Sequence, residues 1–129
     1  KQIRDWLYID DHVEALLKVA LNGKIGETYN IGGKNEIKNI EVVEKICKTL
    51  DQLHPSKHKK VKKYKQLIYF VRDRPGHDKR YAIDARKIRK KLNWVPKQKF
   101  ETGIKKTVKW YLKNIDNYKN IKSKTAIKL

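Results

Sequence analysis

The 129-residue sequence has no methionine and only one cysteine, Cys47. Without methionine the chain contains no start residue, so we expect it to be an excerpt of a longer protein. A single cysteine excludes an internal disulfide framework and fits a reducing compartment, so we expect a cytoplasmic protein. No apolar run approaches the roughly 18 residues that a membrane helix requires, and the first residues do not form the apolar block of a signal peptide. These absences exclude disulfide-stabilised secreted domains and helical membrane proteins.

Glycine-rich phosphate loops are also absent, because the sequence contains neither a G-x-G-x-x-G fingerprint nor a P-loop. The glycine pair Gly32-Gly33 follows a short β-branched segment and is predicted to form a turn at the end of a strand. His54 and His58 are four residues apart, but Pro55 lies between them, so a shared helical face for a metal ion is not expected. The sequence therefore predicts neither a cofactor loop nor a metal site within this chain.

The composition is that of one globular domain with a polar surface, since 39% of the residues are hydrophobic and 36% are charged. The net charge of +19 falls on residues 51–129, because residues 1–50 carry equal numbers of basic and acidic residues. The densest basic segment, residues 57–65, contains six lysines. A strong positive field attracts nucleic acid, anionic membranes or phosphorylated metabolites. Segment 57–65 contains a single aromatic residue, Tyr64, and no arginine, which favours a solvated loop. A basic nucleic-acid-binding module is the alternative from a different functional class.

Hydrophobic periodicity predicts alternating strands and helices. Segments rich in β-branched and aromatic residues predict strands at residues 3–9, 28–31 and 67–71. Apolar residues at helical spacing predict four helices, which begin after a cap at Asp10 or Asp11, at the cap Asn39, after a cap at Asp84, and around Ile104. This order predicts an α/β fold rather than a helical bundle or a β-sandwich. We expect an ordered region at residues 1–115 and a disordered basic tail at residues 116–129.

Residues 73–78, with the sequence Asp-Arg-Pro-Gly-His-Asp, concentrate charged groups and a histidine around a rigid turn. Pro75 fixes its own φ and pushes Arg74 toward an extended conformation. Gly76 lets the backbone approach a ligand closely. His77 shares the turn with acidic residues and an arginine, which favours a functional role over a purely structural one. The turn is suited to binding an anionic group.

Arg4, Arg74 and Asn39 form a second candidate constellation. The planar guanidinium group suits bidentate contacts with phosphate. A helix that begins at Asn39 adds unpaired N–H groups and a favourable dipole for an anion. Each residue alone has a simpler interpretation, because Arg4 can pair with Asp5 or Asp10. Asn39 can be a helix cap and nothing more. Together the three residues predict a pocket for a diphosphate.

Five segments form a recognisable set: Arg-Asp-Trp-Leu-Tyr-Ile-Asp-Asp-His at 4–12, Gly-Glu-Thr-Tyr-Asn-Ile-Gly-Gly at 26–33, Asp-Arg-Pro-Gly-His-Asp-Lys-Arg-Tyr-Ala-Ile-Asp at 73–84, Phe-Glu-Thr-Gly-Ile at 100–104 and Trp-Tyr-Leu at 110–112. This set resembles the C-terminal part of the dTDP-glucose 4,6-dehydratase family, a group of extended short-chain dehydrogenases/reductases. The resemblance covers residues 1–115. Its first segment is shared by many nucleotide-sugar epimerases and dehydratases, whereas the segment at 73–84 is much more specific to the dehydratases.

The resemblance implies an NAD-dependent lyase that converts dTDP-glucose to dTDP-4-keto-6-deoxyglucose and water. In that family the cofactor loop, the Tyr/Lys pair and the Asp/Glu dehydration residues precede the matched region. The chain then corresponds to the C-terminal substrate-binding part of the Rossmann-type fold, with the N-terminal NAD domain missing, and is expected to be inactive alone. The implied partners are a dTDP-sugar, the protein's own N-terminal Rossmann domain and a second copy in a homodimer, with neither a membrane nor nucleic acid.

Position by position, the resemblance implies substrate-binding roles for Arg4, Asn39, Asp73, Arg74, Pro75, Gly76 and His77. The two arginines would neutralise the diphosphate, which agrees with the interpretation from charge. The resemblance implies no catalytic, cofactor-binding or metal-binding residue within this chain. Two features depart from the family: the loop at residues 56–64 is longer and more basic, and the family's late tyrosine contact to the substrate has no counterpart. A part of another nucleotide-sugar dehydratase or epimerase is the alternative within the same class.

Overall fold

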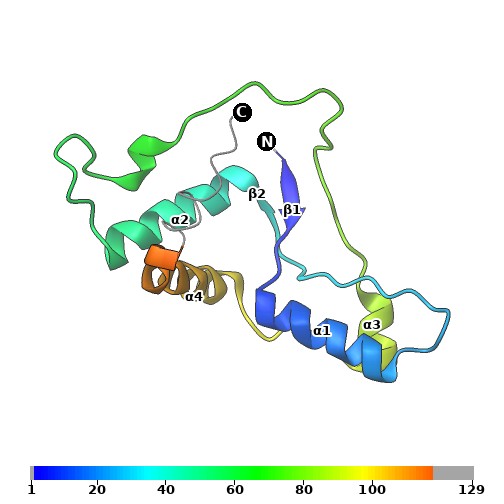
Figure 1. The fold of residues 1–129 in the computed structure, drawn as a ribbon. Helices are drawn as coiled ribbons and strands as arrows, with labels where there is room; N and C mark the ends of the chain where they lie inside the picture. Colours follow the sequence, from blue (N-terminus) through cyan, green and yellow to red (C-terminus); the bar gives the residue numbers. More distant parts are fainter. Residues whose placement is uncertain (1, 118–129) are drawn as a thin grey trace.

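The computed structural model describes residues 2–117, which form two strands, four α-helices and one 3-10 helix (Figure 1). The strands are β1 (Ile3–Asp5) and β2 (Glu36–Lys38). The helices are α1 (Ile9–Asn22), α2 (Asn39–Leu53), the 3-10 helix η1 (Tyr64–Leu67), α3 (Arg86–Leu92) and α4 (Phe100–Lys113). The predicted α/β class is confirmed. Most of the expected tail, residues 118–129, lies outside the described residues.

Strand β1 forms backbone hydrogen bonds with other segments on both of its edges. It pairs antiparallel with β2, so that Ile3 lies opposite Lys38. On its other side, the Ile3 amide donates a hydrogen bond to the Lys79 carbonyl (2.7 Å), and the Tyr81 amide donates to the Ile3 carbonyl (3.1 Å). These bonds hold the chain that follows residues 73–78 against β1, although 73 or more residues separate the two segments along the sequence.

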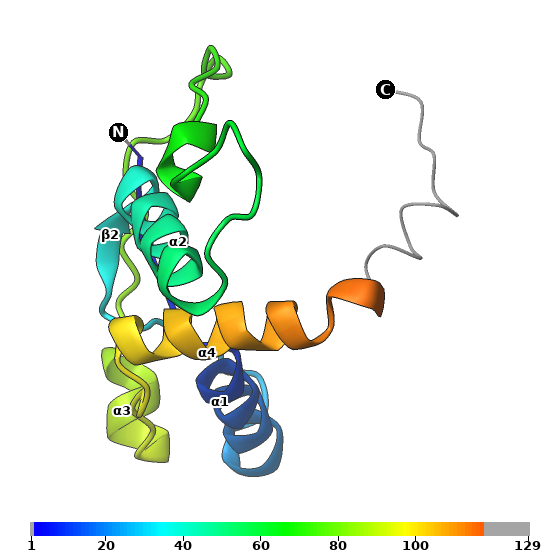
Figure 2. The same ribbon diagram turned by 90° about the vertical axis from the view of Figure 1, so that its left-hand side faces the viewer.

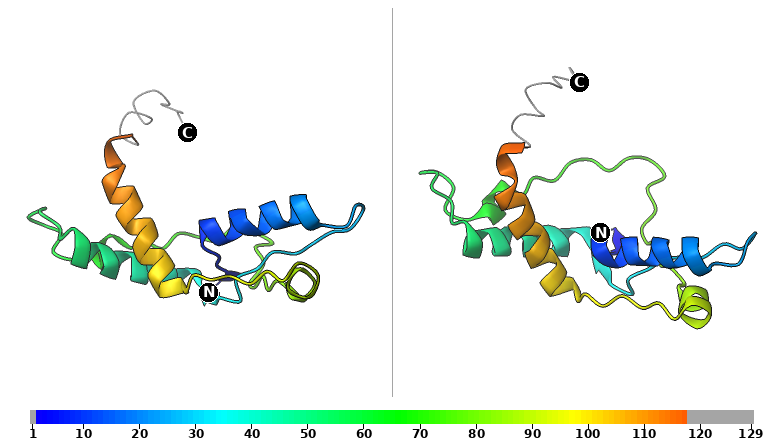
Figure 3. Two further views of the ribbon diagram at one scale, coloured as in Figure 1. Left: turned by 90° about the horizontal axis from the view of Figure 1, so that it is seen from below. Right: turned by 60° about the horizontal axis from the view of Figure 1, so that its bottom comes forward.

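The helices form two groups on either side of β1 (Figure 3). On one side α2 packs against α4 and η1, and on the other α1 packs against α3. Figure 2 shows α4 running across α2. The long irregular segment between η1 and α3 passes over the top of the molecule in Figure 1 and carries the turn at residues 73–78.

The tightest packing lies where α1 meets α3. Trp94 is 2% exposed and Ile88 is fully buried, and both pack with Ala15 and Ala85 in one cluster. Partly buried hydrophobic residues surround this cluster: Leu7, Val19, Tyr29, Ile31 and Leu92. Residues 28–31, predicted as a strand, therefore contribute side chains to the core without belonging to a sheet.

Two of the three predicted strands are wrong, and the first is too long. Residues 28–31 make no ladder, and the segment 67–71 begins as the end of η1 and continues as irregular chain. Tyr69, Phe70 and Val71 are 75–84% exposed. A strand needs a partner that supplies its hydrogen bonds, so β propensity alone does not form one. Strand β1 ends at Asp5, and only three residues separate it from Ile9, the first residue of α1.

The predicted helix caps lie one to three residues from the observed cap positions, Tyr8, Lys38 and Ala85. Asp10 and Asp11 lie in the first turn of α1 rather than at its cap, where their charges face the positive end of the helix dipole. The buried Asp11 carboxylate instead accepts a hydrogen bond from the Gln98 amide (2.9 Å). Asn39 is the first helical residue of α2, and its side chain makes no capping bond. Asp84 lies one position before Ala85, the observed cap of α3. Its carboxylate accepts a hydrogen bond from the Arg86 backbone amide (3.0 Å).

The Gly32-Gly33 pair is required by close backbone approach. The Asp5 carboxylate accepts hydrogen bonds from the amides of Gly33 (2.9 Å) and Asn35 (2.8 Å), which draws this loop against the end of β1. A Cβ atom at Gly33 would lie 2.4 Å from the Trp6 carbonyl oxygen, and one at Gly32 would lie 2.6 Å from an Asp5 carboxylate oxygen. The space beside these glycines is therefore filled by the protein itself.

Gly33→Ala is expected to lower the free energy of unfolding by about 1–3 kcal/mol, because the clashing atom belongs to backbone that cannot move without shifting β1. Urea unfolding of the variant measures this loss. Lys34→Gly is the matched control, since Lys34 has a φ of +56°, which glycine adopts at little cost. An unchanged stability in Gly33→Ala, or an equal loss in Lys34→Gly, contradicts the close-approach explanation.

All six lysines of segment 57–65 are exposed, so the interpretation as a solvated loop is confirmed. Lys65 Nζ lies 2.7 Å from a Glu44 carboxylate oxygen on α2, which ties the end of the loop to the helix. Among residues 2–117, no helix is long and apolar enough to cross a membrane.

One face of α1 is apolar and uncovered within residues 2–117. Five of its hydrophobic residues are 46–80% exposed: Ile9, Val13, Leu16, Leu17 and Leu21. Ile25, in the loop that follows, is 99% exposed. Contiguous apolar exposure of this kind marks a surface that contacts another part of a protein or a partner.

Candidate functional site

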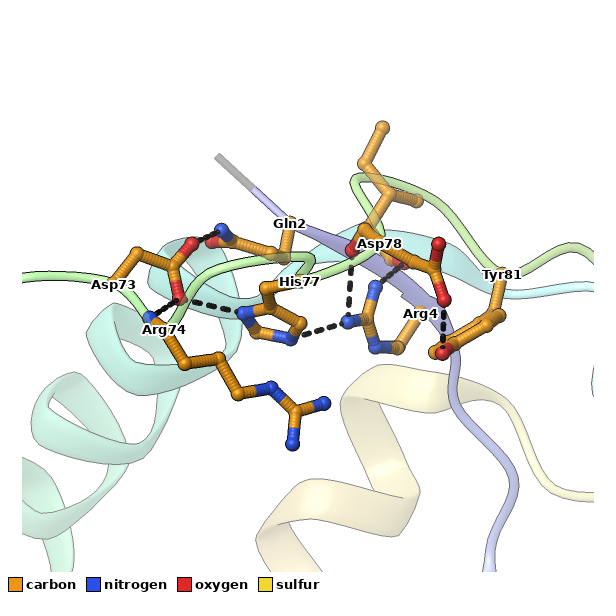
Figure 4. Close-up of polar contacts among 8 residues, drawn as sticks. Gln2, Arg4, Asp73, Arg74, His77, Asp78 and Tyr81 are labelled. Carbon is orange, nitrogen blue, oxygen red and sulfur yellow. Dashed lines mark hydrogen bonds and ion pairs between the residues drawn. The ribbon is translucent and has the colours of Figure 1, made fainter.

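The turn at residues 73–78 lies against β1, and its groups converge on Arg4 (Figure 4). Arg4 Nη2 lies 2.7 Å from His77 Nε2 and donates to the Asp78 carbonyl (3.0 Å). Arg4 Nη1 donates to the Ile3 carbonyl (2.7 Å). The guanidinium carbon also lies 4.3 Å from the centre of the Tyr81 ring. The Arg4 side chain is thus held by hydrogen bonds and by an aromatic face at once.

Asp73 lies on the opposite side of the His77 ring from Arg4. Asp73 Oδ1 is 2.7 Å from His77 Nδ1 and accepts from the Arg74 amide (2.9 Å). The other carboxylate oxygen accepts a hydrogen bond from the Gln2 side-chain amide. The bond with His77 is the largest cause that lowers the pKa of Asp73 below its usual value of 3.8. Asp73 is therefore a fixed negative group at the end of a chain of contacts from Asp73 through His77 to Arg4.

Arg74 is the second arginine of the candidate site, and it lies within the turn itself. The hydrogen bond from the Tyr81 hydroxyl to the Asp78 carboxylate is the main cause that raises the pKa of Tyr81, and the charges of Arg4 and Arg74 both oppose that rise. Both guanidinium groups therefore act on one phenol. In the view of Figure 4 the Arg74 guanidinium lies beneath the His77 ring, with no interaction drawn to it. Both arginines thus lie within electrostatic range of Tyr81, and their convergence on a diphosphate stays a prediction.

Pro75 and Gly76 form the tip of the turn, and both are exposed. Gly76 has a φ of +68°, a conformation that residues with a Cβ atom rarely adopt. The tip needs glycine for its backbone shape, since a Cβ there would meet open space. The two residues shape the loop that carries Asp73, Arg74 and His77.

Asn39 is joined to the site through Gln2 rather than by direct contact. The Asn39 amide donates to the Gln2 carbonyl (2.9 Å), and Gln2 in turn reaches Asp73. The Asn39 side-chain oxygen is buried, with no hydrogen-bond partner among residues 2–117. Of the seven predicted site residues, Arg4 and the residues of the turn are in direct contact. Asn39 is connected to them only through Gln2.

Three residues at the site were given no role from the sequence: Gln2, Asp78 and Tyr81. Asp78 closes the charged turn and Tyr81 follows it closely, so their proximity in sequence was a signal. The stacking of Arg4 on Tyr81 was not foreseeable, because it depends on the pairing of β1 with the segment around Arg80.

Two open cavities lie away from the arginines. One of about 450 Å³ lies between α2 and α4 and is lined by Lys48, Glu101 and neighbouring residues. The other, of about 400 Å³, is lined by His12, Asp84 and neighbouring residues. Arg4 and Arg74 line neither of these two cavities, so the expected diphosphate pocket stays a prediction. These residues also contain no group of three or more His, Cys, Asp or Glu side chains that could hold a metal ion.

The family model described as GDP-mannose 4,6 dehydratase matches residues 1–107. Among curated proteins, the chain is 56% identical over 120 residues to a dTDP-glucose 4,6-dehydratase of Neisseria meningitidis, covering 93% of this chain and 34% of that protein. It is 57% identical over 122 residues to dTDP-glucose 4,6-dehydratase 1 of Escherichia coli K12, covering 95% of this chain and 33% of that protein. The chain thus spans about a third of the length of these relatives.

Solved structures give the same result. The chain is similar, with a TM-score of 0.74 and 44% identity, to the dTDP-glucose 4,6-dehydratase of Bacillus anthracis in complex with NAD, over 89% of this chain and 33% of that one. It is similar, with a TM-score of 0.74 and 33% identity, to a dTDP-glucose 4,6-dehydratase of Streptomyces venezuelae with NAD and TYD bound, over 88% of this chain and 32% of that one. The described fold therefore corresponds to about a third of an extended short-chain dehydrogenase/reductase.

Proposed function

The chain belongs to the GDP-mannose 4,6 dehydratase family, and from this premise we propose that it is the nucleotide-sugar-binding part of a dTDP-glucose 4,6-dehydratase. The whole enzyme is an NAD-dependent lyase that converts dTDP-glucose to dTDP-4-keto-6-deoxyglucose and water. The observation that carries the proposal is that Arg4 is bonded to His77 and Asp78 of the turn at residues 73–78, which also carries Arg74. Identities of 56–57% to curated dTDP-glucose 4,6-dehydratases support the choice of nucleotide and sugar.

The two arginines have different tasks at the diphosphate. A guanidinium group has five N–H donors, and Arg4 uses three of them within the protein. Arg4 is therefore a fixed positive charge that needs little reorganisation when a ligand binds. The Arg74 backbone is tied to Asp73, but its guanidinium forms no hydrogen bond or ion pair within the described part of the chain. Arg74 thus offers the open fork that suits bidentate contact with phosphate. Asp73, Pro75, Gly76 and His77 shape and hold this arrangement.

Asn39 contributes a hydrogen-bond acceptor and the start of a helix to the proposed site. Its buried side-chain oxygen has no partner among residues 2–117, and a polar atom in that position is costly unless a donor reaches it. It also stands at the start of α2, where the helix dipole favours an anion. A bound dTDP-sugar offers both a negative diphosphate and N–H and O–H donors.

The remaining walls of the site come from the rest of the enzyme. The apolar face of α1 is exposed, and the chain corresponds to about a third of its relatives, so a further domain covers this face. We assign NAD to that N-terminal Rossmann domain. The only glycine pair of this chain, Gly32-Gly33, is closed by the Trp6 carbonyl and the Asp5 carboxylate and does not fit a phosphate group. The resemblance extends the proposal to a cytoplasmic homodimer in which this chain alone has no turnover.

Calorimetric titration of the full-length protein with dTDP, UDP and GDP tests the proposal. We expect dTDP to bind at least about tenfold more tightly than the other two, which corresponds to about 1.4 kcal/mol. Preference for UDP or GDP would instead assign the chain to another nucleotide-sugar dehydratase or epimerase. Failure of all three to bind, or formation of the 4-keto-6-deoxy product by residues 1–129 alone, contradicts the proposed division of function.

A further inference from the structure

We infer that His77 is a positioning residue that acts through Arg4: as a neutral imidazole with its proton on Nδ1, fixed by Asp73, it holds the Arg4 guanidinium in place for an anionic ligand. This inference rests on the proposed diphosphate site and adds a role for His77 that differs from direct contact with the substrate. Two observations carry it, namely the two short contacts of the ring and the restraint of Arg4.

The two contacts of the ring determine where its proton lies. His77 Nε2 is 2.7 Å from Arg4 Nη2, and an arginine nitrogen can only donate a hydrogen bond. Nε2 must therefore be the acceptor and carry no proton. His77 Nδ1 is 2.7 Å from the Asp73 carboxylate, which can only accept when ionised. The proton consequently lies on Nδ1, and both ring nitrogens are occupied by protein groups. Neither nitrogen is left to bind a phosphate oxygen.

The contact with His77 completes the restraint of Arg4. The same Nη2 atom also donates to the Asp78 carbonyl (3.0 Å), and Nη1 donates to the Ile3 carbonyl (2.7 Å). With the Tyr81 ring at 4.3 Å, these contacts fix the plane of the guanidinium. His77 is the one side chain that accepts a hydrogen bond from Arg4 within residues 2–117. Without it, Arg4 keeps its charge and loses part of its fixed orientation, so more side-chain entropy is lost on binding.

The contact between His77 Nε2 and Arg4 requires a ring nitrogen that carries no proton. The ring is 21% exposed, and its neighbours are Asp73, Arg74 and Asp78 on its own loop and Arg4 on β1. Protonation of Nε2 would place two donors and two positive charges 2.7 Å apart, which breaks the contact with Arg4. On the Nδ1 side the ring contacts Asp73, whose bonds to the Gln2 side chain and the Arg74 amide hold the carboxylate in place.

Nitrogen NMR of the full-length protein without ligand tests the tautomer directly. With ¹⁵N-labelled histidine at pH 7.5, the Nε2 resonance of His77 is expected in the range of an unprotonated imidazole nitrogen, and Nδ1 in the range of a protonated one. His77→Gln assigns the signals by their loss. Asp73→Asn is expected to reduce the preference for the Nδ1–H tautomer. A proton found on Nε2, or on both nitrogens, overturns the inference even if dTDP binds as proposed.

A double-mutant cycle separates positioning from direct contact. His77→Ala is expected to weaken dTDP binding about tenfold, as for a hydrogen bond to a charged group. In a protein that already carries Arg4→Ala, the same substitution is expected to cause no further loss, because His77 acts through Arg4. His77→Gln should restore part of the affinity, since its amide oxygen can accept from Arg4. His54→Gln, at a histidine that contacts Tyr64 instead, is the matched control and should leave binding unchanged.

The outcomes distinguish this inference from the proposed function. Additive losses in the cycle would show that His77 contacts the ligand itself, and the inference would be wrong while the function stands. Absence of dTDP binding by the unmodified protein would contradict the function, and the NMR measurement would still decide whether His77 accepts a hydrogen bond from Arg4.

Discussion

Replacing both Arg4 and Arg74 with alanine is expected to weaken binding of dTDP-glucose to the full-length protein by at least about 100-fold. A hydrogen bond to a charged group contributes about 1.5–3 kcal/mol, and each 1.4 kcal/mol changes a dissociation constant about tenfold. Loss of two guanidinium groups therefore removes about 3 kcal/mol even at the low end. Each single substitution is expected to cost about 10- to 150-fold. Calorimetric titration gives the dissociation constants.

The control for this double variant must remove two positive charges at a distance from Arg4 and Arg74. Arg86→Ala with Lys90→Ala does so on α3, where Arg86 is paired with Asp84 and both basic side chains are exposed. This variant is expected to bind dTDP-glucose within about twofold of the unmodified protein, because surface charges distant from the ligand are screened by salt. Equal losses in the two double variants would mean that net charge, rather than the position of Arg4 and Arg74, determines affinity.

Trp94→Ala is expected to have the largest effect on stability, a loss of about 3–5 kcal/mol in the free energy of unfolding. Trp94 is 2% exposed and fills the contact between α1 and α3, so its removal leaves a cavity lined by Ile88, Ala15 and Ala85. Its indole nitrogen is buried without a partner among residues 2–117, so Trp94→Phe, which removes that polar group, should cost less. Urea unfolding measures both losses.

Trp110→Ala is the matched control for Trp94, since Trp110 lies on α4 and is 53% exposed. Trp110→Ala is expected to lower the free energy of unfolding by less than about 1 kcal/mol, as for most surface substitutions. If Trp110→Ala costs as much as Trp94→Ala, the core does not lie between α1 and α3. The same conclusion follows if Trp94→Ala leaves the urea midpoint unchanged.

The helices were predictable from the sequence because their signal is local. The apolar periodicity that begins at Asn39 and the one around Ile104 both correspond to helices, α2 and α4. Of the strands, only the first was located from the sequence, and it was predicted too long, because a strand forms only where a partner lies beside it. Residues 67–71 have the composition of a strand but pair with no strand among residues 2–117. Glu36–Lys38 looks unremarkable in the sequence and is a strand because β1 lies opposite.

The site was predictable in its parts and not in its assembly. The charged turn at residues 73–78 attracts notice because six informative residues lie together, and Arg4 does so within its own motif. The contact between Arg4 and His77 spans 73 positions and depends on the bonds of Ile3 with Lys79 and Tyr81, which no local pattern indicates. The expected diphosphate pocket stays a prediction, because Arg4 and Arg74 line neither of the two cavities described above.

The location of the diphosphate in a complex of the full-length protein with dTDP-glucose is the most direct measurement. A crystal structure of that complex is expected to place diphosphate oxygens within about 3 Å of the guanidinium nitrogens of both Arg4 and Arg74. His77 should still lie between Arg4 and Asp73. A diphosphate bound elsewhere, with both guanidinium groups beyond hydrogen-bonding reach, would contradict the assignment of this chain as the nucleotide-sugar-binding part of the enzyme.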